Sequence, residues 1–142
     1  MLKSTVYTAE ATATGGRDGH SKTSDGSLDV ALGVPKEMGG NGQGNNPEQL
    51  FAVGYAACYL GAMKFATSQD KALAKVPDTA EVTAQVGIGP REDVGFGLEV
   101  TLKVSMPGVD KDMVQKIADA GHTICPYSNA TKGNITVKTE VV

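Results

Sequence analysis

Residues 46–66 read NPEQLFAVGYAACYLGAMKFA, and this stretch decides the fold. Asn46 is a good helix cap, Pro47 suits the first helical position, and Glu48 complements the positive end of the helix dipole. We therefore expect a helix that runs from Pro47 to about Ser68. The segment is apolar on nearly every side, so this helix has to be buried in protein. It is too short and too rich in glycine to favour a membrane span.

Alternating and β-branched residues predict strands on both sides of this helix. The expected strands lie at residues 3–14, 20–23, 28–32, 82–88, 96–105 and 135–141. Residues 33–46 are rich in glycine but lack the GK[ST] ending of a phosphate-binding loop, so we expect a plain long loop. Asp110 is expected to cap a second helix, which should end near Cys125 because Pro126 disfavours helical geometry in the residue before it.

The order of these elements predicts an α+β protein with antiparallel sheets around a long buried central helix. We expect residues 1–142 to form a single domain, as suits a chain of this length. Two short sheets cannot easily surround a helix that is apolar all round. An intertwined homodimer that packs two such helices together would bury both, so we expect a homodimer.

The charge balance argues against several partners. Thirteen Lys and Arg residues against sixteen Asp and Glu residues give a net charge of −3, so the basic footprint of a nucleic-acid-binding protein is missing. Residues 1–16 lack the continuous apolar segment of a signal peptide. We therefore expect a cytoplasmic protein that binds neither nucleic acid nor membrane.

The chain has two cysteines, Cys58 and Cys125, and only two histidines, His20 and His122. This inventory makes a standard zinc site improbable, and we expect no cofactor. In a reducing compartment a structural disulfide is disfavoured. Composition alone leaves two alternatives open for the cysteines: small buried apolar residues or redox-active thiols.

Cys58 lies in the middle of the apolar helix, on one stripe with Gly54 and Gly61. Glycine is costly inside a helix, so something approaches this face closely, either a second helix or a substrate. A thiol buried in apolar surroundings has a raised pKa and is inert unless a cation lies near. Arg17, between glycines in GGRDG, is the best candidate cation, although an ordinary solvated arginine in a turn has the same pattern.

Cys125 precedes Pro126 where the second helix stops. A thiol there is either mobile, as a resolving cysteine must be, or simply buried at a helix end. His122, one turn earlier, suggests a Cys–His pair, but we expect it to be a surface or helix C-terminal residue. Tyr127 is either pocket-lining or part of ordinary packing.

Three segments carry a resemblance to a known family. They are ATGGRDG at 13–19, NPEQLFAVGYAACYLGAMK at 46–64 and CPYSNATKGN at 125–134. In sequence, order and approximate spacing they resemble the organic hydroperoxide resistance (Ohr) proteins of the OsmC superfamily, over essentially the whole chain. The last segment resembles the Ohr branch more than the OsmC branch. The resemblance implies the OsmC-like fold.

The resemblance also implies a mechanism. Cys58 matches the peroxidatic cysteine, which becomes a sulfenic acid, and Cys125 matches the resolving cysteine, which forms the disulfide. Arg17 matches the arginine that stabilises the thiolate, and Glu48 the carboxylate that orients it. The implied substrate is an organic hydroperoxide, and the implied reductant is a dithiol such as protein-bound dihydrolipoamide. Gly54 and Tyr127 are candidate pocket-lining residues.

The axial rise of an α-helix limits which residues of one chain can share an active site. Glu48 and Cys58 are ten residues apart, which is about 15 Å of axial rise, more than a Glu side chain spans. We therefore predict an active site at a dimer interface, with Glu48 contributed across it. Two other classes stay open from sequence: a redox sensor or binding module without turnover, and a structural protein with inert cysteines.

Overall fold

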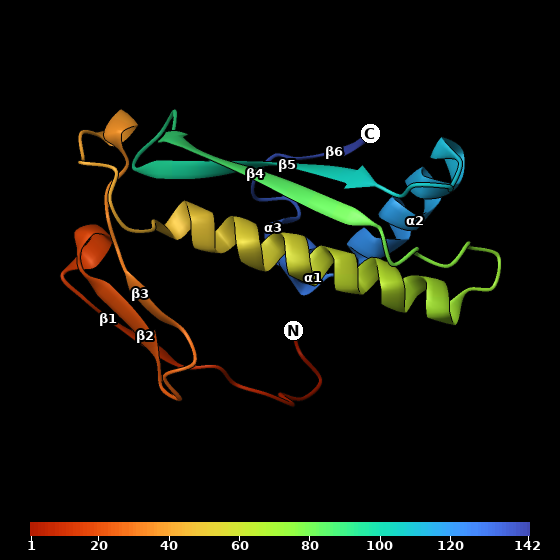
Figure 1. Ribbon diagram of the computed structural model, residues 1–142, viewed down its shortest axis with the longest axis horizontal. Helices are drawn as coiled ribbons and strands as arrows, with labels where there is room; N and C mark the ends of the chain where they lie inside the picture. The colour runs from red at the N-terminus through yellow and green to blue at the C-terminus, as the bar shows by residue number, and fades with distance from the viewer. The chain divides into compact units, whose positions relative to one another are not determined.

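A computed structural model describes residues 1–142, which cluster into two compact units (Figure 1). The N-terminal unit is Met1–Leu50 and the C-terminal unit is Phe51–Val142. The expectation of one domain over the whole chain stays a prediction.

The N-terminal unit contains a three-stranded antiparallel sheet in the order β1-β2-β3. Its strands are β1 (Ala11–Thr14), β2 (His20–Thr23) and β3 (Asp29–Ala31). The first strand is shorter than predicted and begins at Ala11, although the Glu10 carbonyl still accepts the Ser24 N–H at 2.9 Å. A 3₁₀ turn, η1 (Gly16–Asp18), joins β1 to β2, and Gly15 before it has φ 73°, a left-handed conformation that favours glycine.

The loop predicted at 33–46 is confirmed, with one short 3₁₀ helix inside it, η2 (Lys36–Met38). The helix α1 (Pro47–Gln69) then begins where expected. The side chain of Asn46 accepts the Gln49 N–H at 2.9 Å, and the Gln49 side chain accepts the Asn46 N–H at 3.0 Å. This reciprocal pair is a capping box, and it fixes the start of α1.

Only one face of α1 is buried in the chain. Tyr55, Tyr59 and Met63 are fully buried, whereas Val53 and Phe65 are 71% and 54% exposed. A single chain therefore does not surround this helix, as expected, because the sheet and the two other helices of the C-terminal unit cover one side of α1.

By length and composition alone α1 is able to cross a membrane, with a mean hydropathy of 1.3. The length argument against a span was therefore wrong. A buried core helix passes the same test, and the fully buried Tyr55, Tyr59 and Met63 belong to the hydrophobic core of the C-terminal unit. We assign α1 to that core.

The C-terminal unit contains a sheet in the order β4-β5-β6. β4 (Glu81–Pro90) and β5 (Phe96–Ser105) form the predicted antiparallel hairpin. β6 (Val137–Val141) pairs with β5 in parallel, so the prediction of purely antiparallel sheets is wrong here. The reason is topological: two helices lie between β5 and β6, and such a crossover returns the chain to the starting end of the sheet.

Those two helices are α2 (Lys111–Ile124) and α3 (Pro126–Thr131). Asp110 caps α2 as predicted, accepting the Met113 N–H at 3.0 Å, and α2 ends just before Cys125. The short α3 was not predicted. Pro126 stops one helix and also starts the next, because its fixed φ suits a first helical position.

The helices α1, α2 and α3 lie on the same face of the β4-β5-β6 sheet (Figure 1). The core between them is apolar and includes the fully buried side chains Tyr55, Tyr59, Met63, Leu102, Val104, Val114, Ile117 and Cys125. This packing carries Cys58 of α1 and the corner between α2 and α3 toward each other.

Candidate active site

The two cysteines lie side by side in the C-terminal unit. The Sγ atoms of Cys58 and Cys125 are 3.6 Å apart, and both thiols are free. Cys58 is half-buried and Cys125 is fully buried. A disulfide needs its sulfurs about 2.05 Å apart, so a shift of well under 2 Å would join them. Residues 67 positions apart in the sequence thus form one dithiol.

The backbone holds Cys125 at the corner between two helices. Its N–H donates to Gly121 O at 2.8 Å, which closes α2, and its carbonyl accepts the Asn129 N–H at 3.0 Å, which opens α3. Its backbone is extended, with φ −64° and ψ 121°. Cys125 is buried at a helix end, with its sulfur 3.6 Å from that of Cys58, and its mobility stays a prediction.

The close approach predicted at Gly54 is made by Tyr127. A Cβ added at Gly54 would lie 2.8 Å from the Tyr127 hydroxyl oxygen. Phe51, Tyr55 and Tyr127 form an aromatic cluster with ring centroids 5.6 to 5.8 Å apart. Gly61 has no atom within 4 Å of such a Cβ, so nothing in the chain itself explains that glycine.

The surroundings of Cys58 keep its thiol protonated. Burial raises the pKa of Cys58 above its ordinary value, the backbone N–H of Tyr127 opposes that rise, and Cys125 adds to it. A thiolate is the reactive form of cysteine. Within the C-terminal unit Cys58 therefore lacks the cation that reactivity requires, as the sequence predicted.

Arg17 and Glu48 meet within the N-terminal unit. Arg17, on the η1 turn, donates from Nη2 to a carboxylate oxygen of Glu48 in the first turn of α1. The Glu48 side chain is 13% exposed and that of Arg17 38%. The buried Nε of Arg17 has no hydrogen-bond partner. The guanidinium is thus held by Glu48 through Nη2, and the Arg17 side chain stays partly exposed.

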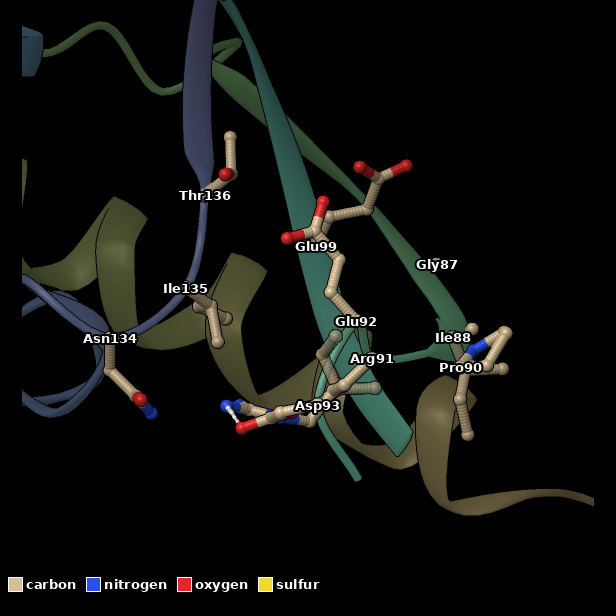
Figure 2. A pocket seen from close by; sticks show the side chains of 13 residues that line it. Gly87, Ile88, Pro90, Arg91, Glu92, Asp93, Glu99, Asn134, Ile135 and Thr136 are labelled. Atoms are coloured by element: carbon tan, nitrogen blue, oxygen red, sulfur yellow. Dashed lines mark hydrogen bonds and ion pairs between the residues drawn. The ribbon is translucent and has the colours of Figure 1, made fainter. Parts of the chain in front are cut away.

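One pocket of the C-terminal unit, of roughly 900 Å³, surrounds the end of the β4–β5 hairpin and is polar, and in Figure 2 Arg91 is bound to Asp93 at its edge. Neither cysteine lines it. A smaller pocket of roughly 400 Å³ is lined by Phe51, Phe96 and Tyr127. Tyr127 lines this smaller pocket, but Cys58, Cys125 and Gly54 do not. That Gly54 and Tyr127 line a substrate pocket at the cysteines stays a prediction.

His122 is a helix C-terminal residue, which was one of the two positions predicted for it. It is half-buried and is not a surface residue. Its Nδ1 pairs with Ser128 Oγ at 2.8 Å and its Nε2 with Thr139 Oγ1 at 2.7 Å, and its ring stacks on Tyr59. Both ring nitrogens are thus paired with hydroxyl groups, and the structure does not show the Cys–His pair. In the sequence, only the serine of CPYS, Ser128, pointed to a hydroxyl partner for His122.

The buried position of His122 predicts a pH dependence of stability. Burial lowers the pKa of His122, with Asp119 opposing, because the charged imidazolium is disfavoured there. The unfolded chain therefore takes up a proton at a higher pH than the folded chain does. We expect the free energy of unfolding to fall as the pH drops from about 7 to about 5. Denaturant unfolding at fixed protein concentration measures this.

A matched pair of variants assigns the effect. His122→Gln should lose much of this pH dependence, while His20→Gln, which changes an exposed residue of β2, should keep it. An identical pH dependence in the parent protein and in both variants would contradict the assignment to His122.

Comparison with known proteins shows the family to which this chain belongs. A family model described as OsmC-like protein matches residues 40–140. The chain is 53% identical to the organic hydroperoxide resistance protein of Xanthomonas axonopodis pv. citri, covering 93% of this chain and 92% of that one. The chain belongs to the OsmC family. The resemblance predicted from sequence is confirmed.

Solved structures agree with this family. The crystal structure of OhrB of Bacillus subtilis has a TM-score of 0.86 at 40% identity and covers 97% of this chain and 100% of that one. A putative organic hydroperoxide resistance protein from Vibrio cholerae, with captopril bound in one of its active sites, has a TM-score of 0.91 at 43% identity, covering 99% and 95%. This OsmC-family chain is thus an α+β protein of the organic hydroperoxide resistance group.

Proposed function

We propose that this protein is a thiol-dependent peroxidase that reduces organic hydroperoxides to alcohols. The single observation that carries the proposal is the 3.6 Å between the sulfurs of Cys58 and Cys125. A solitary buried cysteine suits packing, whereas two free thiols at this distance suit a reversible disulfide.

The reaction balances with these two thiols. The Cys58 thiolate attacks the hydroperoxide O–O bond, which leaves Cys58 as a sulfenic acid and releases the alcohol after protonation. The Cys125 thiol then condenses with the sulfenic acid, forming the disulfide and releasing water. An external dithiol, such as the dihydrolipoamide of a lipoylated protein, reduces the disulfide and is itself oxidised. The apolar walls near Tyr127 suit alkyl or lipid chains.

The cation for Cys58 is Arg17 of a second subunit in this proposal. Arg17 is ion-paired with Glu48 of its own chain, so the two residues are supplied together. Glu48 and Cys58 both lie on α1, ten residues apart, which is about 15 Å along the axis. We therefore assign the pair to the cysteines of the partner in a homodimer, with active sites at the subunit interface.

The exposed face of α1 supports such a dimer. Val53, Ala57, Gly61 and Phe65 recur every four residues, which puts them on one side of the helix, and all four are exposed. Gly61 is open to close approach there. A second α1 packed on this stripe would bury the face that the chain leaves uncovered. We place the protein in the cytoplasm, where thiols stay reduced.

A peroxidase assay tests the proposal. With dihydrolipoamide as reductant, we expect kcat/KM for tert-butyl hydroperoxide to exceed that for hydrogen peroxide by about tenfold or more, because the apolar walls bind an alkyl group. Peroxide consumption and reductant oxidation are followed together. A single stoichiometric oxidation of the thiols, with no further peroxide loss in excess dithiol, would instead identify a redox sensor or binding module.

A further inference from the structure

The environment of Cys125 contains a buried polar network that the peroxide chemistry leaves unused. Its members come from four elements: Tyr55 from α1, His122 from α2, Ser128 and Thr131 from α3, and Thr139 from β6. Tyr55, Ser128 and Thr131 are at most 6% exposed. Burying hydroxyls in an apolar core is costly unless every one is paired, so such a network needs a reason.

The network ties α3 to both of its neighbouring helices, α1 and α2. Ser128 Oγ contacts His122 Nδ1 at 2.8 Å and the Tyr55 hydroxyl at 3.0 Å, so it joins α3 to α2 and to α1. Thr131, one turn later, contacts the same Tyr55 hydroxyl at 3.2 Å and donates to Tyr127 O at 3.0 Å. His122 Nε2 contacts Thr139 at 2.7 Å, which ties this end of α2 to the sheet.

These anchors bracket both cysteines. His122 and Ser128 lie three residues before and after Cys125, so the polar contact between them closes the corner on which Cys125 sits. Tyr55 lies three residues before Cys58 on α1, so its hydroxyl ties the cysteine's own helix to α3. The dithiol distance of 3.6 Å is thus set between two helices that this network joins.

We propose that the His122–Ser128–Tyr55 network is a positioning device for the resolving step: it holds Cys125 against Cys58 so that the disulfide closes quickly once Cys58 is oxidised. The inference rests on the proposed function, since it concerns the second step of that reaction. Reactions between groups fixed in one molecule depend steeply on geometry, and a misplacement of about 1 Å can cost about 100-fold in rate. His122 acts here through the corner and does not touch the sulfurs.

Two rates separate this role from general stabilisation. Oxidation of Cys58 by tert-butyl hydroperoxide is bimolecular, and disulfide closure is unimolecular, so rapid mixing followed by acid quench and mass spectrometry resolves them. We expect Ser128→Ala and His122→Phe to slow closure by about tenfold or more and to change the first step by less than about threefold. His122→Gln keeps donor and acceptor groups and should recover much of the closure rate.

The matched control is Asp110→Ala. It removes the hydrogen bond that caps the start of α2, from the Met113 N–H to Asp110 Oδ1 at 3.0 Å, at the opposite end of that helix from Cys125. Closure should stay within about threefold of the parent rate in this variant, although the lost cap lowers the free energy of unfolding. Equal slowing by Asp110→Ala and Ser128→Ala, or unchanged closure in Ser128→Ala, overturns the proposal. Ser128→Ala is a small enough change to decide the matter even where His122→Phe does not fold.

A peroxide-free measurement separates this inference from the peroxidase proposal. Glutathione disulfide forms a mixed disulfide on Cys58 and releases one glutathione, and attack by Cys125 closes the protein disulfide and releases the second. The network variants should slow that closure by a similar factor. If the network variants close slowly with glutathione but the parent protein does not consume peroxide, the peroxidase proposal alone is overturned. If the parent protein turns over peroxide but closure is unaltered in every network variant, the positioning role alone is overturned.

Discussion

Cys58→Ser should lower the turnover of tert-butyl hydroperoxide at least about 10³-fold relative to the parent protein, the largest loss expected from any single substitution here. A serine hydroxyl stays protonated at neutral pH and is a far weaker nucleophile than a thiolate, and no sulfenic acid forms on it. The exchange of sulfur for oxygen is nearly isosteric at a half-buried position, so the fold should survive. Peroxide consumption with excess dihydrolipoamide measures the loss.

The control for this prediction is Cys125→Ser, which removes the other sulfur of the pair. It should retain the first oxidation and then stop, with sulfenic acid or higher oxides accumulating on Cys58 by mass spectrometry. Full turnover in Cys58→Ser would show that the reacting group lies elsewhere, and both cysteines would then be ordinary core residues.

Local rules predicted most of the helices and strands. The cap at Asn46, the proline at 47, the cap at Asp110 and the alternation in the β4–β5 hairpin each report on a few neighbouring residues, and each is found where expected. The parallel pairing of β6 with β5 was missed because the relative direction of two strands depends on the path of the chain between them. The alternation of apolar and polar residues is the same in a parallel and in an antiparallel strand.

In the candidate site, too, features set by neighbouring residues were predicted and contacts between distant residues were not. The predicted close approach at Gly54 is found, because a glycine inside a helix is costly enough to require a cause. Its cause, the ring of Tyr127, lies in a helix that was not predicted. The burial of His122 was missed for a related reason: whether a helix-end histidine faces solvent depends on Ser128 and Thr139, which only the folded chain brings to it.

A heterodimer of one Arg17→Ala chain and one Cys58→Ser chain should recover about half of the parent activity, although each variant alone is expected to lose about 10²-fold or more. If Arg17 serves the Cys58 of its partner, this heterodimer contains one intact site, with the cysteines of one chain and the arginine of the other. Co-expression with two different affinity tags and two-step purification yields it. An inactive heterodimer would place Arg17 and Cys58 of one chain in the same site.

The pairing of Cys58→Ser with Cys125→Ser supplies the internal control, because those two cysteines lie 3.6 Å apart in one chain and neither site of that heterodimer is complete. It should stay inactive.

The two heterodimers should differ because the cysteines and the arginine belong to different units of the chain. The two cysteines lie within residues 51–142, where burial raises the pKa of Cys58. The Arg17–Glu48 ion pair lies within residues 1–50. The helix that carries both Glu48 and Cys58 separates them by about three turns. A thiol that its own unit keeps protonated and a partly exposed arginine would complement each other, and the proposed homodimer would bring them together.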